Sequence, residues 1–166
     1  NIRTILYAGE KRYITYGINN RADITVADIE LLSGKSRFRV LYKGMDMGKF
    51  ELSLPGMHNI SNALACIGAA VELDINIDDV KKALRDFSGV ERRFQIVGRI
   101  DAQDILVVDD YGHHPTEIKA TLAAAKAGWG RRTIVLFQPH RYTRTRDLMS
   151  EFAGAFRNAD VLLITE

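Results

Sequence analysis

The sequence has few of the features that mark secreted, membrane-bound or nucleic-acid-binding proteins. Its 166 residues include one cysteine, Cys66, which excludes an internal disulfide and fits a reducing cytoplasm. No run approaches the roughly 20 apolar residues that a transmembrane helix needs. Lys and Arg number 23 and Asp and Glu 21, so the net charge of +2 indicates neither a nucleic-acid nor a membrane partner. We therefore expect a cytoplasmic protein with neither kind of partner.

Three further absences concern completeness and phosphate chemistry. The chain begins with NIRTIL, without an initiator Met or a signal-peptide pattern, and we expect it to be a fragment of a longer product. A G-x-x-x-x-G-K-[ST] motif, whose loop cradles nucleotide phosphates, is missing from the sequence. The last apolar run, VLLITE, ends the chain, so we also expect the final domain to be cut short.

The first half of the sequence predicts a β-sheet followed by two helices. Between Arg12 and Leu54, β-branched and alternating runs at 12–18, 24–32, 38–44 and 49–54 predict a meander or mixed sheet. Apolar residues then recur every three or four positions and predict a helix over about 58–73. A second helix is predicted over about 77–87, with acidic residues in its first turn, where the helix dipole favours them.

From Phe94 onward, the sequence predicts apolar strands that alternate with helices. This order is typical of parallel strands covered on both faces, the doubly wound arrangement. We place a domain boundary near 88–92 and assign residues 1–90 and 91–166 to separate domains. The predicted fold class is α/β, in which a β-rich and helical first part precedes a truncated Rossmann-like domain with a parallel sheet.

The stretch VVDDYGHHPTEI, residues 107–118, places carboxylates and imidazoles between a buried strand and a helix. Pro115 suits the first helical position, and Gly128 is predicted to end the helix. The next strand leads into QPHRYTRTR. In open α/β sheets, ligands bind at the carboxyl ends of the strands. We therefore expect the polar residues of the two loops to lie close together: Asp110, Tyr111, His113 and His114 from the first, and His140, Arg141, Tyr142 and Arg144 from the second.

Such a cluster could bind an anionic substrate. Carboxylates can hold ribose hydroxyls or a metal ion, imidazoles can donate to a phosphate, and arginines can clamp a carboxylate. Simpler interpretations remain open. Asp109 and Asp110 could simply stabilise a turn, without any role in binding. The basic run RYTRTR could be an ordinary exposed helix start. Adjacent histidines also lack the i, i+4 spacing that favours a metal site on one helix face. Cys66 is expected to be a small buried residue.

A second polar patch, PGMHNISNA, covers residues 55–63. Asn59 and Asn62 are three residues apart at a helix start, so their amides can point in the same direction. A carboxamide offers a donor and an acceptor side by side, which matches the N6 and N7 edge of adenine. Helix capping by one of the two asparagines is the alternative.

Four segments together, LPGMHNISNALA, GVERRFQ, VVDDYGHHPTEI and FQPHRYTRT, resemble motifs of the Mur ligases of bacterial peptidoglycan synthesis. They occur in the order of that family and extend over essentially the whole chain. Tyr111 and Gly112 favour the alanine-adding branch, because the branch that recycles murein tripeptide typically carries Phe-Ala at these positions. The resemblance implies the second half of the central ATPase domain, joined to the first half of the carboxyl-terminal domain.

The resemblance also implies roles for single residues. The residues matching ATP-binding positions are His58, Asn59, Asn62, Arg93 and Asp110. Those matching amino-acid-binding positions are Tyr111, His113, Arg141 and Arg144. Arg93 and His113 are the implied catalytic residues, and His114 and His140 receive no role. No residue is assigned as a metal ligand, because the ligands of the implied Mg²⁺ should lie mostly outside this chain.

The implied reaction uses ATP, UDP-N-acetylmuramate and L-alanine. ATP phosphorylates the lactyl carboxylate, and the alanine amine then attacks the acyl phosphate. We expect the chain alone to be inactive because half of each site is missing, and we expect the SGVERR linker to be a hinge. Three alternatives are the ligase of the same family that recycles murein tripeptide, a metal-dependent hydrolase using Asp109, Asp110, His113 and His114, and a noncatalytic nucleotide-binding module.

Overall fold

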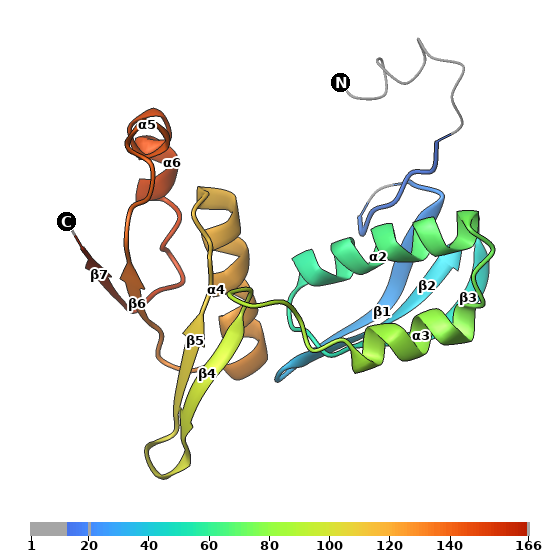
Figure 1. Cartoon of the computed structure of the whole chain (residues 1–166), viewed down its shortest axis with the longest axis horizontal. Helices are drawn as coiled ribbons and strands as arrows, with labels where there is room; N and C mark the ends of the chain where they lie inside the picture. Colours follow the sequence, from blue (N-terminus) through green and yellow to red (C-terminus); the bar gives the residue numbers. More distant parts are fainter. Residues whose placement is uncertain (1–12, 20, 166) are drawn as a thin grey trace.

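The computed structural model describes residues 13–19 and 21–165 and shows two halves joined by a linker (Figure 1). The first half contains β1 (Ile24–Leu32), β2 (Lys35–Tyr42), β3 (Met45–Leu52), α2 (Met57–Glu72) and α3 (Ile77–Asp86). The second half contains β4 (Gln95–Ile100), a 3-10 turn (Asp101–Gln103), β5 (Ile105–Asp109), α4 (Pro115–Trp129), β6 (Ile134–Phe137), α5 (Tyr142–Asp147), α6 (Met149–Ala153) and β7 (Val161–Ile164). Among the described helices, none is long and apolar enough to cross a bilayer.

The sheet of the first half is an antiparallel meander, as predicted, in the order β1-β2-β3. Its tight turns use left-handed backbone conformations, with a φ of 77° at Gly34 and 82° at Gly44. The strand predicted over 12–18 is wrong for the described residues 13–18, which form only an isolated bridge between Tyr16 and Ile24. Arg12 lies outside the described residues.

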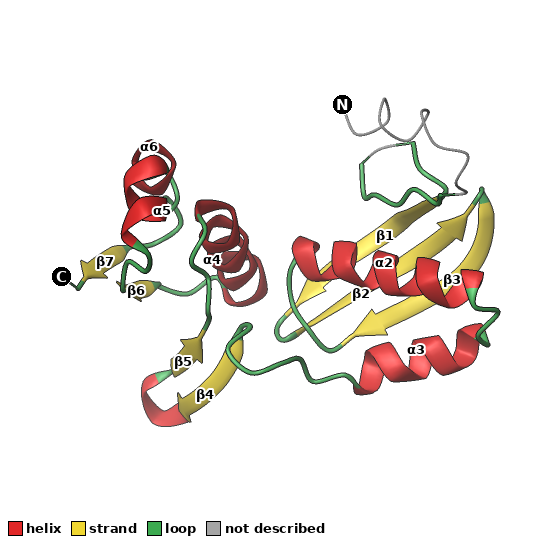
Figure 2. Ribbon diagram, turned by 45° about the horizontal axis from the view of Figure 1, so that its top comes forward, coloured by secondary structure: helices red, strands yellow, loops and turns green. Residues whose placement is uncertain are grey.

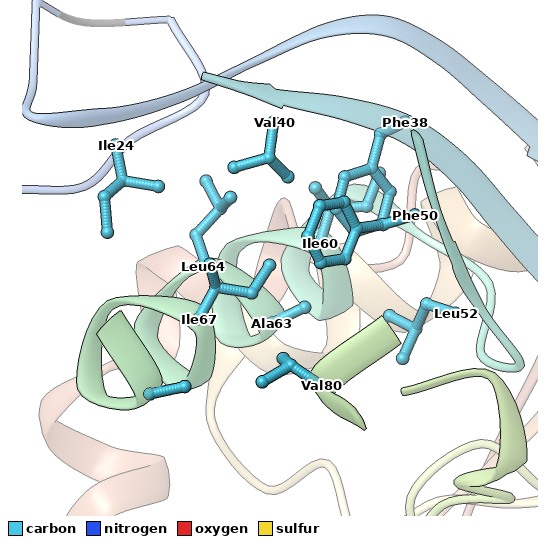
Figure 3. Close-up of a cluster of buried hydrophobic side chains, with 11 residues drawn as sticks. Ile24, Phe38, Val40, Phe50, Leu52, Ile60, Ala63, Leu64, Ile67 and Val80 are labelled. Carbon is cyan, nitrogen blue, oxygen red and sulfur yellow. The ribbon is translucent and has the colours of Figure 1, made fainter. Parts of the chain in front are cut away.

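Both predicted helices of the first half are confirmed, and Figure 2 shows α2 lying across the sheet. The apolar residues of α2 face the strands because they recur at helical spacing. They pack with side chains from all three strands and from α3 into one core, including Ile24, Phe38, Val40, Phe50, Ile60, Leu64, Ile67 and Val80 (Figure 3). The expectation for Cys66 is wrong, because this residue is exposed on the outer side of α2.

The second half differs from the predicted parallel sheet. β6 and β7 pair in parallel, but β4 and β5 form a separate antiparallel pair. The connection between β4 and β5 contains only residues 101–104, which is too short for the crossover that parallel strands require.

The helices of the second half cover one face of the β6–β7 pair. Ile118 and Leu122 of α4 pack with Phe152 of α6, and Val135 and Phe137 of β6 lie against this cluster. On the other face, Leu136 is 71% exposed and its register partner Leu163 is 52% exposed. The prediction of cover on both faces is therefore wrong for the described residues.

Two predicted helix boundaries also differ from those in the structure. The helix that starts at Pro115 continues through Gly128 to Trp129 and ends at Gly130, whose φ of 61° supplies the left-handed C-cap. The single helix expected after β6 is two short helices, α5 and α6, interrupted at Leu148.

The two halves contact each other through α4, which lies against β1 and α2. One close approach is at Gly56, the residue before α2, whose φ is 100°. A Cβ atom on Gly56 would lie 2.8 Å from the Cβ of Ala124 in α4. Glycine is therefore required here for both its conformation and its size, and this contact fixes the amino end of α2 beside the second half.

Candidate active site

The linker between the halves, residues 88–94, has an unusual backbone. The φ angles are 97° at Gly89, 58° at Arg92 and 49° at Phe94, and such values cost energy for residues other than glycine. Hydrogen bonds hold these residues in place. The Phe94 N–H donates to Asp110 Oδ2 at 2.9 Å, and the Tyr111 N–H donates to the Arg92 carbonyl at 2.7 Å. The linker is thus tied to the loop that follows β5.

Asp110 is the centre of this connection. Besides Phe94, it accepts a hydrogen bond at Oδ1 from the Gly112 N–H at 2.7 Å. Each carboxylate oxygen retains a lone pair that could accept from a ligand hydroxyl. The turn-stabilising interpretation of this acid is therefore confirmed, and the ribose-binding role stays a prediction compatible with it.

The loop after β5 leads into α4 through a helix cap. His114 is the N-cap residue, Pro115 is the first helical residue as predicted, and the His114 Nδ1 accepts from the Thr116 N–H at 3.3 Å. Glu117 Oε2 accepts from the N–H groups of His113 and His114 at 3.1 and 3.2 Å. His114, to which no role was assigned, therefore shapes the start of the helix.

Glu117 also reaches across to the linker. Its Oε1 accepts from Nη1 of Arg93 at 3.2 Å. Partial burial would raise the pKa of Glu117, but the hydrogen bonds that its carboxylate accepts hold this pKa below the ordinary value. Glu117 was assigned no role from the sequence, although its position three residues after the N-cap is the capping-box pattern.

Three predicted ATP-binding residues come together although they are far apart in the sequence. His58 lies in the first turn of α2, Arg93 in the linker and Asp110 after β5. Burial lowers the pKa of His58; the carboxylate of Asp110 opposes this shift and the guanidinium of Arg93 adds to it. The imidazole of His58 is therefore neutral at pH 7 and faces groups of both charges.

Tyr111 and His113 form an aromatic group on the same loop. Their rings meet edge to face with centroids 4.9 Å apart, and the Arg92 guanidinium lies 4.8 Å from the Tyr111 ring centre. His113 Nδ1 lies 3.0 Å from the Tyr111 carbonyl, which leaves Nε2 available to a ligand. Tyr111 is 41% exposed, so its ring is accessible at the surface.

The two asparagines of α2 have different surroundings. Asn59 Nδ2 donates to the Pro55 carbonyl at 2.8 Å, whereas the side chain of Asn62 is exposed. The capping alternative is wrong, because the N-cap is Gly56 and no side chain caps this helix. The carbonyl oxygen of Asn59 remains free to accept, so adenine recognition stays a prediction.

The arginines after β6 are not joined to this cluster by any interaction among the described residues. β5 and β6 belong to separate sheets, so no ladder sets the distance between their exits. Both strands lead toward the side where α4 begins and α5 lies (Figure 1). Arg141 and His140 are exposed, Arg144 is partly buried, and Arg141 has a φ of 68°. Their proximity to His113 remains a prediction.

The described residues contain no cluster of three or more His, Cys, Asp or Glu side chains that could hold a metal ion. Three of the four residues of the hydrolase alternative make other contacts. Asp109 lies 3.4 Å from Arg92, Asp110 accepts backbone N–H groups, and His114 caps α4. These side chains therefore do not fit a metal centre by themselves.

A cleft of about 380 Å³ lies at the junction of the halves. Ser53 and Pro55 line it from the first half, and Arg93 and Phe94 line it from the linker. Trp129, at the end of α4, also lines it and stacks on Phe94 with ring centroids 5.2 Å apart. The linker is thus accessible to a small ligand on the side where Arg93 lies.

Comparison with known proteins identifies both halves. The sequence-family model of the Mur ligase middle domain matches residues 2–70, and the family model of the Mur ligase glutamate ligase domain matches residues 92–166. The UDP-N-acetylmuramate–L-alanine ligase of Geotalea daltonii is 49% identical over 166 residues, and that of Geobacter sulfurreducens is 50% identical over 167. Each match covers 100% of this chain but only 36% of the relative, so the chain spans little more than a third of these proteins.

Solved structures of two ligases are also similar. The UDP-N-acetylmuramate–alanine ligase of Thermotoga maritima matches with a TM-score of 0.81 and 34% identity, covering 92% of this chain and 34% of that one. A murein peptide ligase of Psychrobacter arcticus matches with a TM-score of 0.59 and 30% identity, covering 90% and 31%.

Proposed function

Because the chain belongs to the Mur ligase family, we propose that it is part of an ATP-dependent ligase that joins L-alanine to UDP-N-acetylmuramate. The observation that carries the proposal is the identity of about half of all residues, along the whole chain, to proteins with this name. The names of these relatives, together with Tyr111 and Gly112, favour alanine over murein tripeptide as the added group.

The residues of the candidate site suit a reaction in which negative charge develops on phosphate and acyl oxygen atoms. A carboxylate is a poor electrophile, so transfer of the γ-phosphoryl group of ATP to the lactyl carboxylate must come first. The alanine amine then attacks the acyl carbon, and phosphate leaves with the electrons of the broken C–O bond. Bound Mg²⁺ would neutralise phosphate charge, but the described residues do not build a site for it.

In this proposal the chain supplies the nucleotide and amino-acid contacts. Arg93 binds ATP phosphate oxygens with the N–H groups that Glu117 does not use, and Asp110 accepts from the ribose hydroxyls. The amides of Asn59 and Asn62 recognise adenine, beside the neutral ring of His58. Tyr111, His113, Arg141 and Arg144 orient alanine, with the arginines paired to its carboxylate.

The full-length protein provides the direct test of this function. Purified protein is supplied with ATP, Mg²⁺ and UDP-N-acetylmuramate, together with either L-alanine or murein tripeptide, and the amide product is measured. We expect product with alanine, dependent on ATP, and none from the 166-residue chain alone. Faster ligation of the tripeptide would favour the recycling reaction. Tight ATP binding by the isolated chain, without ligation by the full-length protein, would favour a nucleotide-binding module.

Arginine substitutions test the amino-acid site. Arg141→Ala or Arg144→Ala in the full-length ligase should raise the KM for alanine by about tenfold or more, because each change removes a charged hydrogen bond to the carboxylate. The KM for ATP should change by less than about twofold. Arg146→Ala is the matched control, because Arg146 is an α5 arginine that pairs with the adjacent Asp147 at 2.8 Å. An unchanged KM for alanine in both variants would contradict the assignment.

A further inference from the structure

We propose that Glu117 is a positioning residue that fixes Arg93 relative to the loop carrying His113, an inference that rests on the proposed function. Glu117 touches neither ATP nor alanine in this proposal and acts through Arg93. Its carboxylate is the one direct side-chain link, within the described part of the chain, between the Arg93 guanidinium and the second half.

The two oxygens of Glu117 have separate tasks. Oε2 accepts from the N–H groups of His113 and His114, which are partly buried just before α4 and have no acceptor within the helix. Oε1 faces the other way and accepts from Arg93. An ionised carboxylate can do both because it has acceptors on both sides and no donor.

The link leaves Arg93 usable for a ligand. Only Nη1 of Arg93 bonds to Glu117, so the remaining N–H groups of the guanidinium can still reach phosphate oxygens. The Arg93 side chain is 48% exposed, and without the carboxylate it would sample several rotamers at the surface. Glu117 therefore sets the orientation of Arg93 before ATP arrives, and this reduces the entropy lost on binding.

Glutamine separates the two tasks. In Glu117→Gln, the amide oxygen can continue to accept from the backbone N–H groups of His113 and His114. The amide nitrogen would then face Arg93, and two donors repel each other. The helix cap is thereby retained while Arg93 is released, so an effect on catalysis should appear without unfolding.

The experiment is a double-mutant cycle in the full-length ligase, with Glu117→Gln and Arg93→Ala alone and combined. Glu117→Gln should lower kcat/KM for ATP by about tenfold, with the KM for alanine within about twofold and the thermal midpoint nearly unchanged. In the Arg93→Ala background, the same change should alter kcat/KM for ATP by less than about twofold. Glu151→Gln is the matched control, because Glu151 also lies in a first helical turn and its carboxylate hydrogen-bonds to no described residue.

The outcomes are distinct. An equal loss from Glu117→Gln in both backgrounds, or no loss in the unmodified background, would overturn the positioning role while leaving the ligase function intact. If the unmodified protein forms no amide product, the proposed function fails and this inference fails with it.

Discussion

Replacing Arg93 with alanine in the full-length ligase should lower kcat/KM for ATP by about 100-fold to 1000-fold. This is the range for removing one preorganised donor from a site where negative charge develops. Arg93 lies in a linker held by its neighbours and is bonded to Glu117 at 3.2 Å, so its guanidinium is directed before the nucleotide binds. Its charge also acts on the His58 imidazole, which places it beside the predicted nucleotide contacts.

Two further variants make the expectation for Arg93 specific. Arg93→Lys keeps the charge but loses the planar fork, so it should recover only part of the loss. Arg99→Ala removes an exposed arginine of β4, located 3.9 Å from Asp101, and should change kcat/KM for ATP by less than about twofold. Steady-state kinetics with ATP varied at saturating alanine provide the measurement. A loss confined to the KM for alanine would move Arg93 from the phosphate site to the amino-acid site.

Local periodicity was sufficient to predict the two helices of the first half. Ile60, Leu64 and Ile67 lie on one face of a helix by spacing alone, and the structure buries all three. The strand predicted over 12–18 failed because alternation does not guarantee a partner. In the described residues, Thr15 is instead held by hydrogen bonds with Asp23.

The second half was predicted less well because its strand directions depend on the length of a connection and its helix boundary depends on the backbone conformation at the helix end. A four-residue connection makes β4 and β5 antiparallel, whatever their composition. Gly128 and Gly130 are equally plausible helix terminators in the sequence, and only the left-handed conformation of Gly130 selects between them. The doubly wound prediction holds locally, where β6 and β7 pair in parallel.

The candidate site shows the same division between local and long-range information. Motif spacing identified Asp110 and His113, whose backbones are fixed by residues within a few positions. It could not show that Asp110 also anchors the linker, nor that Glu117 reaches Arg93, because these contacts join residues 16 and 24 positions apart. The approach of His58 to this cluster depends on how the two halves pack, which no single motif encodes.

A core substitution should have the largest effect on stability. Phe50→Ala should lower the free energy of unfolding by about 3–5 kcal/mol, because truncating a buried aromatic ring leaves a cavity. Phe50 is only 2% exposed and stacks on Phe38, its partner across β2 and β3, with ring centroids 6.1 Å apart. The Lys81 ammonium also lies 5.4 Å from the ring centre and would lose this contact.

Urea unfolding followed by circular dichroism measures this loss directly. Met45→Ala is the control on the same strand, because Met45 is 65% exposed and its truncation should change the free energy by less than about 0.5 kcal/mol. Before denaturant is added, the fluorescence of Trp129, the only tryptophan, should match that of the unmodified chain, since this residue packs on Phe94 in the second half. Equal destabilisation by both substitutions would contradict a core centred on the face of the sheet that α2 and α3 cover.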